Sequence, residues 1–203
     1  VTPKPDGDLP VRCYRPAADG PLPTVVFFHG GGFTLGTLDS AGSIARELAV
    51  RGPALVLSID YRLAPEDPFP AAVDDAYAAL EWATEYAEDL GGDSDHLAVA
   101  GSSAGGNLAA TATLRAREAG GPDLAHQALL YPMVDRDLSY DSYEENADGP
   151  LLTRADVAWF WDQYCASAVD AYNPFAAPLR ARSLSGLAPA TVVTAGHDPL
   201  RDE

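Results

Sequence analysis

A serine between two glycines is the clearest sign of chemistry in this sequence. The run Gly101-Ser102-Ser103-Ala104-Gly105 has the G-x-S-x-G spacing, which holds a nucleophile on a tight turn between a strand and a helix. The apolar residues 97–100 precede it, and residues 104–119, rich in Ala and Leu, follow it. Glycines two positions to either side relieve crowding at such a turn, which selects Ser103 over Ser102. The pattern predicts acyl transfer through the Ser103 hydroxyl, the alternative being a glycine-rich turn with an incidental serine.

A second glycine-rich segment, His29-Gly30-Gly31-Gly32-Phe33, follows the apolar residues 24–28. Three glycines allow several backbone N–H groups to point inward together, and the N–H of Ala104 would complete a donor set for the oxyanion of a tetrahedral intermediate. The alternatives are a flexible turn or a phosphate-binding loop. No Lys-Ser or Lys-Thr pair and no G-x-G-x-x-G accompanies the segment, which disfavours nucleotide binding.

A serine nucleophile needs an imidazole as its base, and none of the four histidines is well placed. His96 and His126 are expected at the amino-terminal ends of strands, on the edge of the sheet away from Ser103. His29 opens the glycine segment. His197 adjoins an acidic residue, and neighbouring side chains in extended backbone point to opposite sides, so only a substitute role is left to it.

Apolar runs alternate with stretches of helical period, which predicts a mostly parallel sheet with helices on both faces. Asp198 follows the last strand and should share the carboxyl edge of the sheet with Ser103. We expect residues 136–150 to form a long loop or an excursion above the sheet, within an excursion of loop and helix over about 136–166. The expected strands are 9–14, 24–28, 54–59, 97–100, 127–131 and 190–194, all but the first fully buried; the expected helices are one beginning near residue 39, then 72–90, 104–119 and 153–165.

Composition narrows the class of partner. With 13 Lys plus Arg against 30 Asp plus Glu, the formal charge of -17 repels nucleic acid and anionic membranes. No apolar run reaches the roughly 20 residues that span a bilayer, and residues 1–6 lack a signal-peptide core. Cys13 and Cys165 form neither a disulfide framework nor a metal motif, so we expect a cytoplasmic protein. Acyl transfer through a serine needs no metal or organic cofactor, and none is expected.

Four motifs in this order resemble the hormone-sensitive-lipase-like branch of the α/β-hydrolases: residues 29–33, 61–66, 101–106 and 198–202. The resemblance implies an α/β-hydrolase fold and a serine carboxylesterase acting on small esters of short or medium acyl chain. It implies Gly31, Gly32 and Ala104 as oxyanion donors and Asp198 as the triad acid. Residues 61–66 are expected to brace loops near the site.

The resemblance also implies N-terminal lid helices and a C-terminal histidine region that this sequence does not show. We therefore expect residues 1–203 to be one incomplete catalytic domain, inactive by itself, with an exposed sheet edge that causes poor solubility or homo-oligomers. The alternatives are a catalytically dead small-molecule-binding module, or amidase, lactonase or deacetylase chemistry. The aromatic cluster at residues 159–164 is expected to pack against the core, with pocket lining as the alternative.

Overall fold

A six-stranded sheet organises the chain, with strand order β3-β5-β4-β6-β7-β8. The computed structural model describes residues 2–4 and 7–203, so Val1, Pro5 and Asp6 of the segment 1–6, which was inspected above for a signal-peptide core, lie outside the described residues. Only β3 runs antiparallel to its neighbour β5, and the other four pairings are parallel. The strands are β3 (Val11–Tyr14), β4 (Leu22–Phe28), β5 (Leu55–Ile59), β6 (Gly92–Ser102), β7 (His126–Leu130) and β8 (Ala190–Val193), and a hairpin of β1 (Thr2–Lys4) and β2 (Gly7–Leu9) precedes them.

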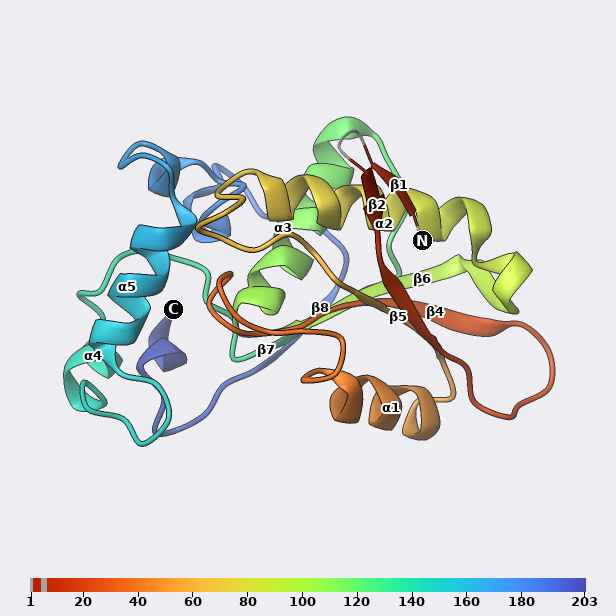
Figure 1. Cartoon of the computed structure of the whole chain (residues 1–203), viewed down its shortest axis with the longest axis horizontal. Coiled ribbons are helices and arrows are strands. Elements are labelled where there is room, and N and C mark those ends of the chain that lie inside the picture. The colour runs from red at the N-terminus through yellow and green to blue at the C-terminus, as the bar shows by residue number, and fades with distance from the viewer. Residues whose placement is uncertain (1, 5–6) are drawn as a thin grey trace.

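Helices cover both faces of this sheet (Figure 1). Helix α1 (Gly42–Arg51) buries Ala45 and Ala49 on one face, while α2 (Ala71–Tyr86) and α3 (Ala104–Ala119) pack on the other. Burial on both sides explains why the central strands are continuous apolar runs. The remaining elements are α4 (Asp141–Glu145), α5 (Arg154–Tyr164) and four 3₁₀ turns, η1 (Glu88–Leu90), η2 (Asp170–Tyr172), η3 (Pro178–Arg180) and η4 (Pro199–Asp202).

Local signals in the sequence predicted several boundaries correctly. Helix α3 has the predicted bounds and ends at Gly120 in the left-handed conformation, with φ 62°. Helix α5 begins with the expected capping box, in which Thr153 and Asp156 bond each other's backbone N–H groups at 2.9 and 3.1 Å. Helix α2 stops at Tyr86, four residues before the predicted end, and η1 and left-handed Gly91 follow it.

Two expectations were wrong and a third was incomplete. Strand β8 was expected to be buried, but Val192 is 54% exposed and Val193 45% exposed, because β8 is an edge strand of the sheet that the described residues form. The stretch 136–150, expected to be a long loop or an excursion above the sheet, contains α4, whose bonds to η4 a sequence pattern does not reveal. Strand β6 begins at Gly92, so His96 lies within it rather than at its start.

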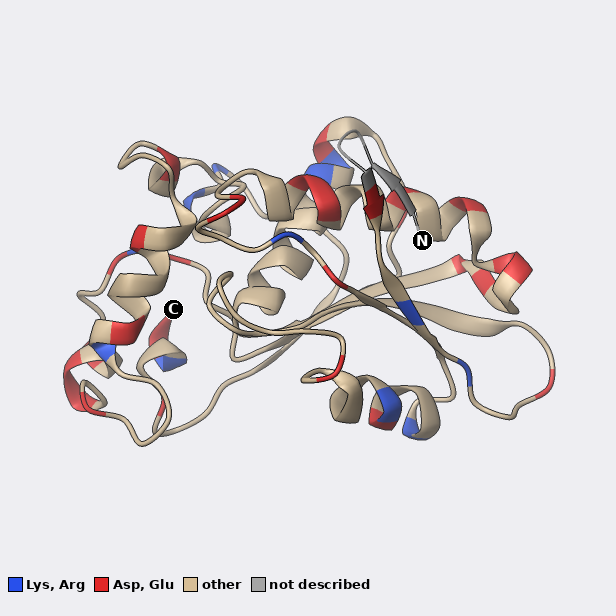
Figure 2. Ribbon diagram, in the orientation of Figure 1, with Lys and Arg blue, Asp and Glu red and all other residues tan. Residues whose placement is uncertain are grey.

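The chain is acidic, with 30 Asp plus Glu against 13 Lys plus Arg, and Figure 2 shows acidic residues along α2 and around α4. No helix among the described residues is both long and apolar enough to cross a membrane.

Candidate active site

Ser103 occupies a strained turn at the carboxyl edge of the sheet. It stands between the last residue of β6 and the first residue of α3, with φ 54° and ψ -120°. A non-glycine residue with positive φ is uncommon, and such strain concentrates at functional sites. Ser103 is only partly buried. The turn therefore presents the residue at the surface above the sheet, as the sequence pattern predicts.

The two flanking glycines are required by close backbone approaches. A Cβ at Gly101 would lie 2.1 Å from the carbonyl oxygen of Gly105. A Cβ at Gly105 would lie 2.1 Å from the carbonyl oxygen of Phe28, at the end of β4. Neither space holds a methyl group, so the G-x-S-x-G spacing follows from the packing of α3 against the strands beside it.

The glycine segment after β4 lies against this turn. A Cβ at Gly30 would be 3.4 Å from Cβ of Ser103. Gly31 and Gly32 have φ of 127° and 58°, a region that favours glycine. No hydrogen bond among the described residues has the N–H of Gly31, Gly32 or Ala104 as its donor. Three amide donors near the carboxyl edge of the sheet therefore have no intramolecular acceptor among the described residues.

The segment at 61–66 braces this loop, as the sequence suggested. The Tyr61 hydroxyl donates to the carbonyl oxygen of His29 at 2.8 Å, and the Ala64 N–H donates to the carbonyl oxygen of Phe33 at 2.9 Å. Arg62 anchors the brace to α2 through the buried carboxylate of Asp75, with Nη2 to Oδ1 at 2.8 Å. The segment 61–66 therefore links the glycine loop to α2, through hydrogen bonds to the loop on one side and the Arg62–Asp75 ion pair on the other.

His29 shapes the loop and is not aimed at the nucleophile. Its Nδ1 lies 2.8 Å from the carbonyl oxygen of Gly30, which only accepts hydrogen bonds, so Nδ1 carries the proton. Nε2 is buried and has no partner among the described residues. Burial lowers the pKa of this imidazole, which keeps it neutral at neutral pH. The ring stacks on Tyr61, with centroids 4.2 Å apart.

Asp198 lies at the same edge of the sheet as Ser103. It follows β8, which runs parallel to β7 as β7 does to β6, so the carboxyl ends of β6 and β8 lie at one edge, about 10 Å apart with β7 between them. One carboxylate oxygen accepts the Leu200 N–H at 2.9 Å and so caps η4. Burial raises the pKa of the Asp198 carboxyl above its usual value.

Two of the other three histidines are held away from Ser103. His96 is in the first half of β6, where its Nδ1 is 2.8 Å from the Asp93 carboxylate. His126 begins β7 at the opposite edge of the sheet, with Nε2 2.9 Å from the Thr191 hydroxyl. His197, next to Asp198, is exposed. The structure therefore brings Ser103, the glycine loop and the Asp198 segment to one edge of the sheet, while His29, His96 and His126 are bonded to other partners.

The aromatic residues of α5 divide between two roles. Trp161 and Tyr164 are buried, and Tyr164 stacks on Phe33 with centroids 3.7 Å apart, so the packing interpretation is confirmed for both. Phe160 lies directly over the glycine loop, since a Cβ at Gly32 would be 2.2 Å from its ring. Trp159 is 51% exposed.

Two features of the site were missed from the sequence. Tyr131, after β7, has φ 38°. It is a third strained non-glycine residue at this edge, in addition to Phe33 and Ser103. Glu203 places a buried carboxylate against the loop after β7. Neither residue carries a motif that a spacing argument recognises, because both depend on contacts between distant segments.

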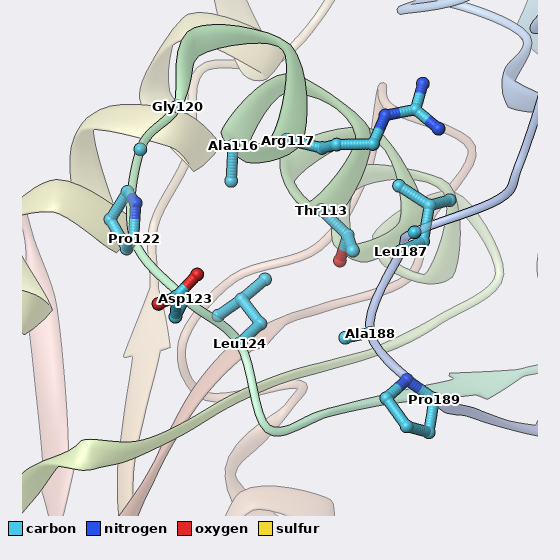
Figure 3. Close-up of a pocket in the computed structure, with 12 residues that line it drawn as sticks. Thr113, Ala116, Arg117, Gly120, Pro122, Asp123, Leu124, Leu187, Ala188 and Pro189 are labelled. Atoms are coloured by element: carbon cyan, nitrogen blue, oxygen red, sulfur yellow. The ribbon is translucent and has the colours of Figure 1, made fainter.

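A hollow at the far end of α3 is a separate feature (Figure 3). Thr113, Ala116 and Arg117 line it about 20 Å along the helix from Ser103. Arg117 already donates to the carbonyl oxygens of Ser183 and Ser185, both at 2.9 Å. Across the part of the chain that the structure describes, no group of three or more His, Cys, Asp or Glu side chains is arranged to hold a metal ion.

A strained serine after a parallel strand, beside a glycine loop and an acid from a later strand, defines an α/β-hydrolase site. A family model described as the alpha/beta hydrolase fold matches residues 25–203. The chain belongs to this family, in its hormone-sensitive-lipase-like branch.

Relatives agree with this assignment. The chain is 49% identical over 201 residues to carboxylesterase NlhH of Mycobacterium tuberculosis, covering 97% of this chain and 63% of that protein. It is 50% identical over 207 residues to carboxylic ester hydrolase LipN of the same organism, covering 99% and 55%. A thermostable esterase from Pseudomonas putida superposes with a TM-score of 0.95 at 43% identity, covering all of this chain and 65% of that one. The chain thus spans less than two thirds of each of these proteins.

Proposed function

We propose that the protein is a serine carboxylesterase that hydrolyses small esters of short or medium acyl chain through an acyl-enzyme on Ser103. The observation that carries the proposal is the strained Ser103 turn lying against a loop of amide donors that have no intramolecular acceptor. Relatives named as carboxylesterases and esterases support it.

In the proposed reaction the Ser103 oxygen attacks the ester carbonyl carbon, and the N–H groups of Gly31, Gly32 and Ala104 stabilise the oxyanion. Donors fixed in place before reaction contribute several kcal/mol to such a step. An imidazole oriented by Asp198 takes the serine proton and returns it to the leaving alcohol, and water then releases the acid. His29, His96 and His126 are bonded to other partners and do not take this role.

The test is hydrolysis of p-nitrophenyl esters from acetate to decanoate by the full-length gene product. Ser103→Ala should abolish turnover, whereas Ser102→Ala, one residue earlier at the end of β6, should retain it because the Ser102 hydroxyl is not on the turn. An inert wild-type protein across all these acyl lengths, or equal losses in the two variants, refutes the proposal.

A ligand-binding module of the same fold is the second candidate, and it would share the Ser103 turn and the glycine loop with the esterase. The two candidates differ in one measurement. A binding module would bind esters in equilibrium dialysis and leave them intact, while the esterase releases alcohol.

We also propose a cytoplasmic location. Both cysteines are free, Cys13 exposed and Cys165 buried, which suits a reducing compartment. Fractionation of cells that produce the protein at native level, followed by immunoblotting, tests this; recovery from the medium or the membrane fraction contradicts it.

A further inference from the structure

Glu203 places a buried carboxylate between two segments that the site needs. Its Oε2 accepts the backbone N–H groups of Val134 at 2.5 Å and Asp135 at 3.0 Å. Its Oε1 accepts the hydroxyl of Tyr143, a fully buried residue of α4. Three donors from two separate segments therefore converge on one side chain.

The amides that Glu203 binds belong to the loop that contacts the nucleophile. Met133, immediately before Val134, donates its N–H to the carbonyl oxygen of Ser103 at 3.2 Å. Asn107 of α3 donates to the carbonyl oxygen of Met133 at 2.8 Å. The loop is thus tied to the Ser103 turn on one side, and Glu203 binds it one residue further on.

The other end of the connection is the turn that carries Asp198. Asp198 caps η4 at its start, and the Glu203 N–H donates to the carbonyl oxygen of Leu200 at its end, at 3.4 Å. Helix α4 is hydrogen-bonded to the same turn, since the Ser142 hydroxyl donates to the carbonyl oxygen of Pro199 at 2.7 Å. Asp198 and Glu203 therefore belong to one short, internally bonded unit.

We propose that Glu203 is a positioning residue that holds the Asp198 turn in register with Ser103 through the Val134 and Asp135 amides. The role that we assign to Asp198 rests on the proposed function, while the contacts stand on the structure alone. The hydrogen bonds from the Ser103 carbonyl to Glu203 run through three consecutive residues, Met133, Val134 and Asp135. Displacements of about 1 Å at such a site can cost a hundredfold in rate.

The geometry separates the role of length from that of charge. Glutamine has the same length, keeps one oxygen for both amides, and offers an N–H₂ to the oxygen of Tyr143. Aspartate keeps the charge but is shorter by one carbon–carbon bond, about 1.5 Å. Its carboxylate therefore cannot reach both the Val134 and the Asp135 N–H groups. A positioning role therefore predicts that Glu203→Gln is mild and that Glu203→Asp is severe.

The experiment measures kcat and KM for p-nitrophenyl butyrate with the full-length gene product. We expect Glu203→Gln to stay within about threefold of wild type, and Glu203→Asp to lose about tenfold or more in kcat with little change in KM. Tyr143→Phe, which removes one of the three donors, should fall between them. The matched control is Glu145→Gln, since Glu145 lies on α4 and pairs with Arg201 of η4 at the surface. Unchanged kcat in folded Glu203→Asp, or a loss confined to KM, overturns the inference.

A second readout does not depend on activity. Amide hydrogen exchange, followed by mass spectrometry over peptides spanning residues 133–136, should match wild type in Glu203→Gln and be faster in Glu203→Asp and Glu203→Ala. If the wild-type protein hydrolyses no ester, the proposed function fails, and exchange alone decides whether Glu203 holds the loop. Equal protection in all variants overturns the inference in either case.

Discussion

Glu203→Gln should stabilise the chain at alkaline pH and leave it unchanged at acid pH. Burial raises the pKa of the Glu203 carboxyl from its ordinary value of 4.5 to about 7. The folded protein therefore holds a proton between these pH values that the unfolded chain releases, so the free energy of unfolding falls as pH rises from 4.5 to 7. At 1.36 kcal/mol per unit, the full change is about 3 kcal/mol.

Glutamine cannot ionise, so this contribution disappears in the variant. At pH 8 Glu203→Gln should exceed wild type by up to about 3 kcal/mol in free energy of unfolding, and at pH 4.5 the two should agree within about 0.5 kcal/mol. The assay is urea unfolding followed by tryptophan fluorescence at half-unit pH steps. Subtracting the wild-type curve removes the pH dependence of groups far from residue 203, which both proteins share.

The matched control is again Glu145→Gln, because Glu145 is exposed and its change should give no pH-dependent difference. The reasoning is refuted if Glu203→Gln is less stable than wild type at pH 8. It is also refuted if the difference between the two proteins does not vary with pH.

Three further predictions concern packing, the brace and the sheet edge. Gly105→Ala should prevent folding, because its Cβ would lie 2.1 Å from a backbone oxygen. Gly120→Ala, whose Cβ would meet nothing within 4 Å, should cost only about 1 kcal/mol for its φ of 62°. Circular dichroism melting curves that coincide for the two variants would contradict this. Asp75→Asn should weaken the buried contact with Arg62, cost about 3 kcal/mol in urea unfolding and lower kcat; a fully active variant would show that the brace is dispensable. Val192→Lys should reduce self-association of the 203-residue chain in sedimentation velocity, because it charges the exposed face of β8; a wild-type chain that is already monomeric refutes this.

The sequence alone determined the parts of this protein that depend on neighbours along the chain. The Ser103 turn, the bounds of α3 and the capping box of α5 follow from glycine spacing, helical period and local hydrogen bonds. The glycine segment was also visible, because conformations with φ near 58° and 127° favour that residue. Local rules suffice where the partner atoms lie within a few residues.

Only the tertiary structure decided the helix α4 and the surroundings of Glu203. Both depend on what a distant segment places beside them, since α4 and Glu203 are held by bonds across about 60 to 70 residues of sequence. A carboxylate looks the same in a sequence whether solvent or three protein donors surround it, and it is burial that gives Glu203 its unusual pKa.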